Sequence, residues 1–163
     1  MGTPFKTPIE RFLRRIEEDI DFFEYNGVSP EQALIIAKER SKYILLDAVA
    51  LMDIKSNPDI VFSNCNEISE IFNEDWTQTE LSIVVGLMYQ LYLDKDIPKL
   101  KLMNVNYTSS ELRVLDPSNA RKSFMEMYEF VCAQNDGYID EYRNKDRLTG
   151  KYKTVDFAAY DDV

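Results

Sequence analysis

Carboxylates are the side chains of this sequence whose spacing could hold a metal ion. They gather at three places: Glu17, Glu18, Asp19 and Asp21; Glu67, Glu70, Glu74 and Asp75; Asp161 and Asp162. Glu17 and Asp21 fall on one helical face, where a divalent ion could bridge them. Two stretches begin like calcium-binding loops, at Asp19 and at Asp94, but neither has glycine at its sixth position. The pattern favours solvated acidic surfaces, and we assign no metal ligand.

Histidine is absent from the chain, and this count bears most directly on catalysis. Without histidine, the chain lacks the usual general base, the commonest transition-metal ligand and any Ser–His or Cys–His nucleophile. Cys65 and Cys132 are far apart and form no CxxC pair, so we expect ordinary thiols. The five glycines never cluster into a phosphate-binding or dinucleotide-binding loop. We therefore predict a protein that is not an enzyme and has no cofactor. A carboxylate-only metalloenzyme, which would retain its metal through purification, is the remaining catalytic alternative.

Length and charge restrict the partners of the chain. Its 163 residues suit one main domain, and 45% hydrophobic with 29% charged residues is ordinary for a globular protein. A net charge of −10 argues against a broad nucleic-acid-binding surface and against docking on an anionic membrane. The first residues form no apolar signal segment, so we expect synthesis in the cytoplasm and reduced thiols.

Helix signals predict a mainly α protein, a bundle around a buried central helix. Thr77 and Glu80 form a capping box before the run Leu81–Leu93, which is apolar nearly all round and too short to span a membrane. Start signals also precede the other predicted helices, over residues 7–26, 30–55 and 117–143. Asn26-Gly27 ends the first of these, so the first two should form a hairpin. In the long C-terminal helix, Asn135-Asp136-Gly137 is a place where the helix could kink or split.

The predicted helix over residues 30–55 has two apolar faces. One contains Leu34, Ala37, Ile44, Leu45, Ala48, Leu51 and Met52. The other contains Ile35, Ile36, Tyr43, Leu46, Val49 and Ala50. A helix sandwiched between two neighbours within one domain accounts for both faces, and this is the interpretation that we favour. In the alternative, the second face binds another subunit through Ile35, Ile36 and Tyr43.

The segments outside these helices are less regular. Residues 66–72 are predicted to form a short helix, and Trp76 to be a structural side chain that packs on Leu81. Residues 99–115 partly alternate apolar and polar side chains, which fits a loop or a short β-hairpin. Residues 147–163 lack a helical stripe, so we expect an extended C-terminal arm after a helical domain at 1–146. The candidate partner-binding residues of this arm are Tyr152, Val155, Phe157 and Tyr160.

Two segments of the sequence resemble a known class of protein. They are NEDWTQTELSIVVGLMYQLYLDKDI and NVNYTSSELRVLDPSNARKSFMEMYEFV, at residues 73–97 and 104–131. Together they look like the small helical neck proteins of tailed bacteriophages, the head-to-tail connector or adaptor class, over residues 70–145. The resemblance implies a structural protein of the virion neck. Such a protein forms a homo-oligomeric ring, here expected to be twelvefold, that contacts the portal protein and a further neck or tail protein. It implies no catalytic or ligand-binding residue, and an acidic ring would let DNA pass without binding it.

A rival interpretation rests on charge alone. A chain of net charge −10 could be a small acidic regulatory or inhibitor protein, for example a nucleic-acid mimic that occupies a basic site on a host protein. A mimic needs carboxylates in a phosphate-like row on one face, whereas here they are spread over both ends of the chain. We therefore place the structural connector first. On that view, a chain cut after Asp146 should stay folded but no longer assemble.

Overall fold

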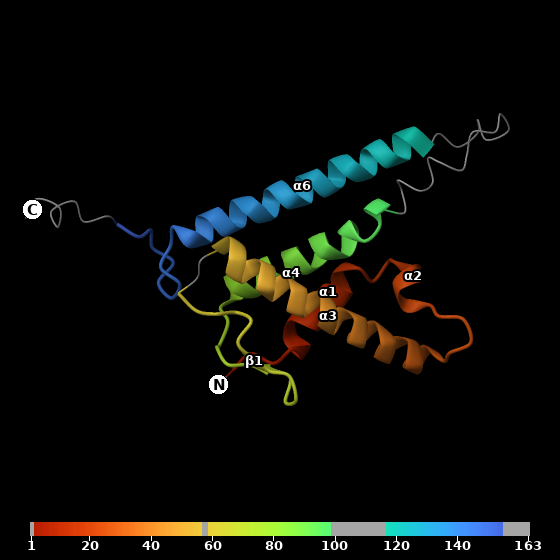
Figure 1. Ribbon diagram of the computed structural model, residues 1–163, viewed down its shortest axis with the longest axis horizontal. Coiled ribbons are helices and arrows are strands. Elements are labelled where there is room, and N and C mark those ends of the chain that lie inside the picture. The colour runs from red at the N-terminus through yellow and green to blue at the C-terminus, as the bar shows by residue number, and fades with distance from the viewer. Residues whose placement is uncertain (1, 57–58, 99–116, 155–163) are drawn as a thin grey trace, which may run out of the picture.

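The computed structural model describes residues 2–56, 59–98 and 117–154. Its helices are α1 (Lys6–Arg15), α2 (Ile20–Phe23), α3 (Pro30–Ser56), α4 (Gln78–Asp94) and α6 (Pro117–Arg143), and its strands are β1 (Cys65–Asn66) and β2 (Ile71–Phe72) (Figure 1). The prediction of a mainly α protein is confirmed. The loop or hairpin predicted at 99–115 and the end of the arm, 155–163, lie outside the described residues.

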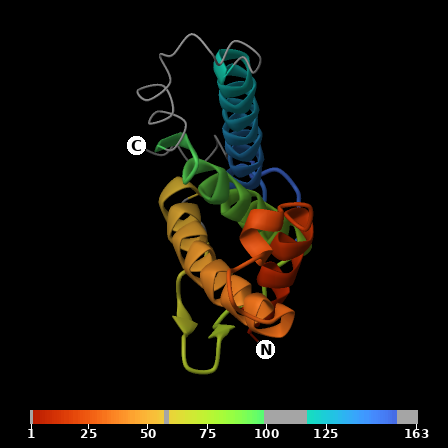
Figure 2. The same ribbon diagram turned by 90° about the vertical axis from the view of Figure 1, so that its right-hand side faces the viewer.

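Helix α4 is the centre of the molecule. Its N-terminus carries the predicted capping box, in which Thr77 Oγ1 accepts from the backbone N–H of Glu80 at 3.3 Å. The buried apolar side chains of α4 are Leu81, Ile83, Val84, Val85, Leu87, Met88 and Leu93. Because these point in all directions around the helix, α4 needs neighbours on every side. It packs against α1, α3 and α6, and Figure 2 shows it between α6 on one side and α1 with α3 on the other.

The N-terminal helix of the prediction is broken in the structure. Instead of one helix over 7–26, α1 begins at Lys6, Ile16 leaves the helical conformation, and the short α2 follows. Ile16 and Phe22 are both buried, although about 120° would separate them around a straight helix. The break lets both side chains reach the core, where the Phe22 ring lies 6.1 Å from that of Phe12. In the structure Phe22 is buried, whereas Ile20, two residues earlier, is exposed.

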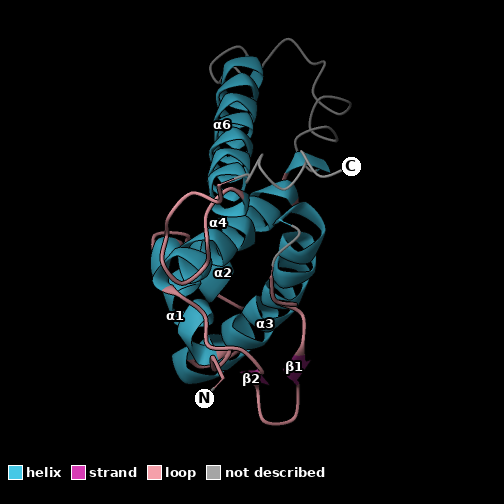
Figure 3. Ribbon diagram, turned by 90° about the vertical axis from the view of Figure 1, so that its left-hand side faces the viewer, coloured by secondary structure: helices cyan, strands magenta, loops and turns pink. Residues whose placement is uncertain are grey.

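Residues 66–72 form a hairpin turn rather than the predicted short helix. Strands β1 and β2 pair antiparallel, with Cys65 opposite Phe72, and Figures 2 and 3 show the hairpin projecting from the helices. The side chain of Asn66 accepts from the backbone N–H groups of Ile68 (3.0 Å) and Ser69 (3.1 Å), which favours a turn over a helix. Phe72 is buried against Trp76, with ring centroids 4.2 Å apart, so the prediction that Trp76 is structural is supported.

Helix α6 is continuous across Asn135-Asp136-Gly137, where the sequence suggested a kink or split. Asn135 is buried and turned toward α4. Its Nδ2 donates to the backbone oxygen of Gly86 (3.0 Å) and to Oε1 of Gln90 (2.9 Å). Glycine at position 86 leaves room for this contact, because a Cβ there would lie 2.6 Å from Asn135 Oδ1. A buried amide pair of this kind sets how α6 is positioned along α4.

Candidate functional site

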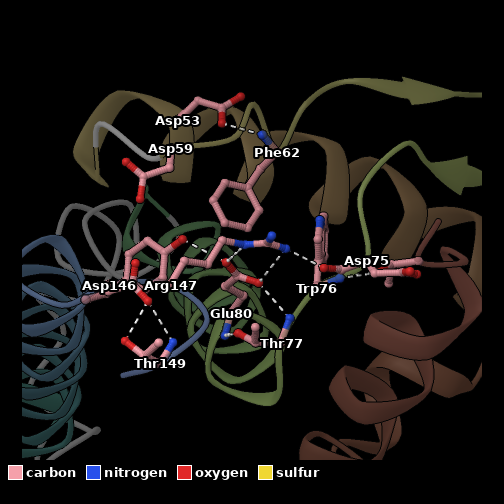
Figure 4. Close-up of polar contacts among 12 residues, drawn as sticks. Asp53, Asp59, Phe62, Asp75, Trp76, Thr77, Glu80, Asp146, Arg147 and Thr149 are labelled. Carbon is pink, nitrogen blue, oxygen red and sulfur yellow. Dashed lines mark hydrogen bonds and ion pairs between the residues drawn. The ribbon is translucent and has the colours of Figure 1, made fainter. Parts of the chain in front are cut away.

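The most buried charged group in the described residues is the carboxylate of Glu80, with 0% of its surface exposed. Its Oε1 accepts from Arg147 Nε at 2.6 Å and from the Tyr142 hydroxyl at 2.7 Å. Its Oε2 accepts from the backbone N–H of Thr77 at 2.6 Å and from Arg147 Nη2 at 3.3 Å. Figure 4 shows the Arg147 guanidinium between Glu80 and the backbone of Asp75, whose carbonyl oxygen accepts from Nη2. We call Thr77, Glu80, Tyr142 and Arg147 the Glu80 cluster.

Local structure brings each member of the Glu80 cluster into place. The capping box holds Glu80 at the first turn of α4, and the last turn of α6 supplies Tyr142. Beyond α6 the chain turns sharply, because Asp146 Oδ1 accepts from the backbone N–H and the hydroxyl of Thr149, both at 2.7 Å. Gly150 has a φ of +66°, a conformation that favours glycine. This turn directs Arg147 toward α4.

Electrostatics in the Glu80 cluster match a paired, buried charge. Burial raises the pKa of Tyr142 above its ordinary value, and the hydrogen bond to Glu80 raises it further. The hydrogen bond to Glu80 likewise raises the pKa of Arg147. Both oxygens of Glu80 are engaged by two donors each, so the carboxylate has no open position from which to take a proton from a substrate. The cluster therefore joins α4, the end of α6 and the start of the arm.

A groove of about 570 Å³ adjoins the cluster, between the first turn of α4 and the end of α6. Gln78 and Ser82 line one side, and Tyr138 and Lys145 the other. In the parts of the chain that the structure describes, no three Cys, Asp or Glu side chains are grouped so that they could hold a metal ion. No helix within these described parts is long and apolar enough to cross a membrane.

The predicted partner-binding residues are only partly placed. Tyr43 is 66% exposed, Ile35 is also exposed, and Ile36 is half-buried. On the same face of α3, Val49 is buried and Leu46 packs against the core, so within the described residues the domain covers part of this face and leaves Ile35 and Tyr43 exposed. Tyr152 is exposed and lies beside Lys145, whose Nζ is 5.0 Å from the ring centroid. The other three, Val155, Phe157 and Tyr160, lie outside the described residues.

Sequence reasoning missed two exposed apolar side chains on the long helices. Ile54, 80% exposed on α3, and Phe130, 64% exposed on α6, were not named as candidates. Helical periodicity could have found Ile54, because it is eleven residues from Tyr43 and falls on the same side of α3. Sequence reasoning also missed the pairing of Glu80 with Arg147, because the two residues are 67 positions apart and no local pattern predicts the contact.

Comparisons of the chain with protein-family models, with curated proteins and with solved structures found no match. The functional argument therefore rests on the chain itself.

Proposed function

We propose that this protein is a non-enzymatic structural subunit that works by binding copies of itself and other proteins. The observation that carries the proposal is the set of large apolar side chains exposed on the two longest helices. On α3 they are Leu34, Ile35, Tyr43 and Ile54; on α6 they are Met127, Phe130 and Tyr138. Exposed apolar side chains gathered along helices are typical of protein–protein contacts.

The placement of these side chains supports a ring better than a closed dimer. The exposed sets belong to two different helices, α3 and α6, so each can serve as a separate contact surface. A contact between unlike patches of successive copies generates a ring when its rotation closes. The buried Glu80 cluster would hold α6 rigidly on α4, and a repeating contact requires a rigid subunit.

The assembly that we propose is the neck of a tailed bacteriophage, between portal and tail. Two properties support it: the resemblance of residues 73–97 and 104–131 to neck proteins, and the net charge of −10. A ring of such subunits would carry a strongly negative field, which repels the phosphate backbone and lets DNA pass without being bound. The portal protein and a further neck or tail protein would be its neighbours in the virion.

The test is the native mass of the full chain, measured by sedimentation over a range of concentrations. We expect a species near twelve times the chain mass of 19.1 kDa. Phe130→Ser should shift this species toward the single chain without loss of helix, because Phe130 is exposed. Ile68→Ser is the matched control: Ile68 is 98% exposed in the hairpin turn and belongs to neither long helix, so its loss should leave the mass unchanged. A wild-type chain that stays at 19.1 kDa throughout would refute the ring and favour the acidic regulatory protein.

A further inference from the structure

Helices α3 and α6 each carry a row of surface residues at alternating spacings of three and four. On α3 the row is Tyr43, Asp47, Ala50 and Ile54, and on α6 it is Met127, Phe130, Gln134 and Gly137. Gln134 is half-buried and the other seven are exposed. This spacing keeps four residues on one side of a helix, and it is the spacing by which two helices pack side by side. We call the two rows the α3 seam and the α6 seam.

The α6 seam contains a glycine that the described part of the chain does not explain. Glycine is unfavourable in the interior of a helix. At Gly86 a Cβ would meet Asn135, so an internal contact requires glycine there, but a Cβ at Gly137 would meet no atom within 4 Å. Gly137 therefore leaves an open gap on the surface of α6, which a side chain from another molecule can enter.

The two seams complement each other when one helix runs antiparallel to the other. Each large aromatic side chain then meets a small residue, and the two polar side chains meet each other. The facing pairs are Tyr43 with Gly137, Asp47 with Gln134, Ala50 with Phe130, and Ile54 with Met127. The amide of glutamine can donate to a carboxylate, and a polar pair within an apolar seam specifies the register of two helices.

A parallel alignment of the same seams fits less well. If the polar pair is kept, Tyr43 faces Phe130 and Ala50 faces Gly137, so large residues meet large ones and small residues meet small ones. The antiparallel alignment would also bring Arg40 next to Glu141. We do not count this pair, because Arg40 donates to the Tyr25 hydroxyl and Glu141 accepts from Lys145 of its own chain.

We propose that the α3 seam of one copy packs antiparallel against the α6 seam of the next copy. This inference rests on the proposed self-assembly and names the contact that produces it. The contact joins two unlike surfaces, so it can repeat from copy to copy. Over the eleven residues from Tyr43 to Ile54 it is about 17 Å long at 1.5 Å per residue.

Photo-crosslinking in the full chain tests the contact and its direction. A benzophenone-bearing phenylalanine in place of Phe130 should label α3 of a second copy near Ala50, in a product of twice the chain mass of 19.1 kDa. In place of Tyr138, further along α6, the same group should label nearer Tyr43, toward the N-terminus of α3. In place of Ile68, which belongs to neither long helix, it is the matched control and should not label α3. Labels in the opposite order along α3, on other elements or within one chain would overturn the proposal.

A variant at Gly137 separates the contact from the folding of the helix. Gly137→Leu fills the gap that faces Tyr43, so the yield of the crosslink from position 130 should fall about tenfold. The helix content measured by circular dichroism should not fall, because the position is open and leucine is a better helix former than glycine. Glu129→Leu adds the same side chain at an exposed position outside the seam and should leave the yield unchanged. An unchanged yield in Gly137→Leu would refute the contact.

Failure of this contact can be distinguished from failure of the proposed function. If the wild-type chain assembles but the label falls outside α3, the contact is wrong and the self-assembly stands. If the native mass stays at 19.1 kDa at every concentration and no doubled product forms, both are wrong.

Discussion

Replacing Arg147 with methionine tests whether the Glu80 cluster holds the fold together. Methionine keeps much of the apolar length of arginine but removes every hydrogen-bond donor and the positive charge. Arg147 makes contacts at 2.6 and 3.3 Å to the two oxygens of Glu80, and a further bond to the carbonyl of Asp75. The variant leaves Glu80 buried and without a cation.

The expected loss of unfolding free energy is about 3 kcal/mol. Removal of one partner from a buried ion pair costs roughly 3–5 kcal/mol, because the other charge stays in the interior. The lower end applies here, since Thr77 and Tyr142 still donate to Glu80 and hydrogen bonds to a charged group contribute about 1.5–3 kcal/mol. Domains of ordinary stability unfold at a cost of about 5–15 kcal/mol, so the effect should be large.

Urea unfolding followed by circular dichroism measures this loss as a shift of the midpoint at constant slope. Arg143→Met is the matched control, four residues earlier on α6. Its guanidinium is 3.7 Å from Asp140, both side chains are largely exposed, and its removal should cost less than about 1 kcal/mol. Adding Glu80→Gln to Arg147→Met should restore part of the lost stability. Equal midpoints for the wild type and Arg147→Met would refute the reasoning.

The same contacts change the stability that we expect for a chain cut after Asp146. Ending the chain after Asp146 removes Arg147 and leaves Glu80 unpaired, so that product should be destabilised by a similar amount. A cut after Thr154 retains the cluster and tests the arm alone.

Three further outcomes are expected. Gly86→Ala should lower the melting temperature, because the new Cβ would lie 2.6 Å from Asn135 Oδ1. Overpacking costs about 1–3 kcal/mol, more than the roughly 1 kcal/mol gained in helix propensity. A higher melting temperature would contradict the close approach of α4 and α6. The pKa of Tyr142 is raised above 10.0, so the folded chain keeps the phenol proton while the unfolded chain loses it; stability should be full below pH 10 and fall above it. Tyr142→Phe should therefore show a shallower decline than the wild type in urea midpoints measured from pH 9 to 11, and identical slopes would exclude this cause. Asn66→Ala should lower the free energy of unfolding by about 0.5–1.5 kcal/mol in thermal unfolding, because two N–H groups of the turn lose their acceptor. Asn66→Asp retains an acceptor and should retain the stability. Equal losses in the two variants would argue against the turn.

The long helices could be read from the sequence because their signals are local. The start of α4 depends on a contact between residues three apart, and α3 and α6 begin at prolines, Pro30 and Pro117. The even apolar distribution of α4 also predicted its central position. Local signals were insufficient where tertiary packing decides between two conformations. The break after α1 brings Phe22 into the core, and the hairpin at 65–72 buries Phe72 beside Trp76.

For the candidate site, the sequence identified individual residues but not what surrounds them in the fold. It found the capping role of Glu80, but the burial of that carboxylate and its cation, 67 residues away, depend on how α6 and the following turn pack on α4. It found Tyr43 as a candidate surface residue but left open whether the domain would cover it.

By itself, the sequence determined where the three long helices lie, which helix is central, and the lack of histidine chemistry. Periodicity and end-capping involve residues within a turn or two of each other, so they can be read along the chain. Only the tertiary structure decided that Glu80 is buried and paired and that Tyr43 and Ile54 of α3 face outward. Burial depends on which distant segments come together, and that is a property of the packed fold.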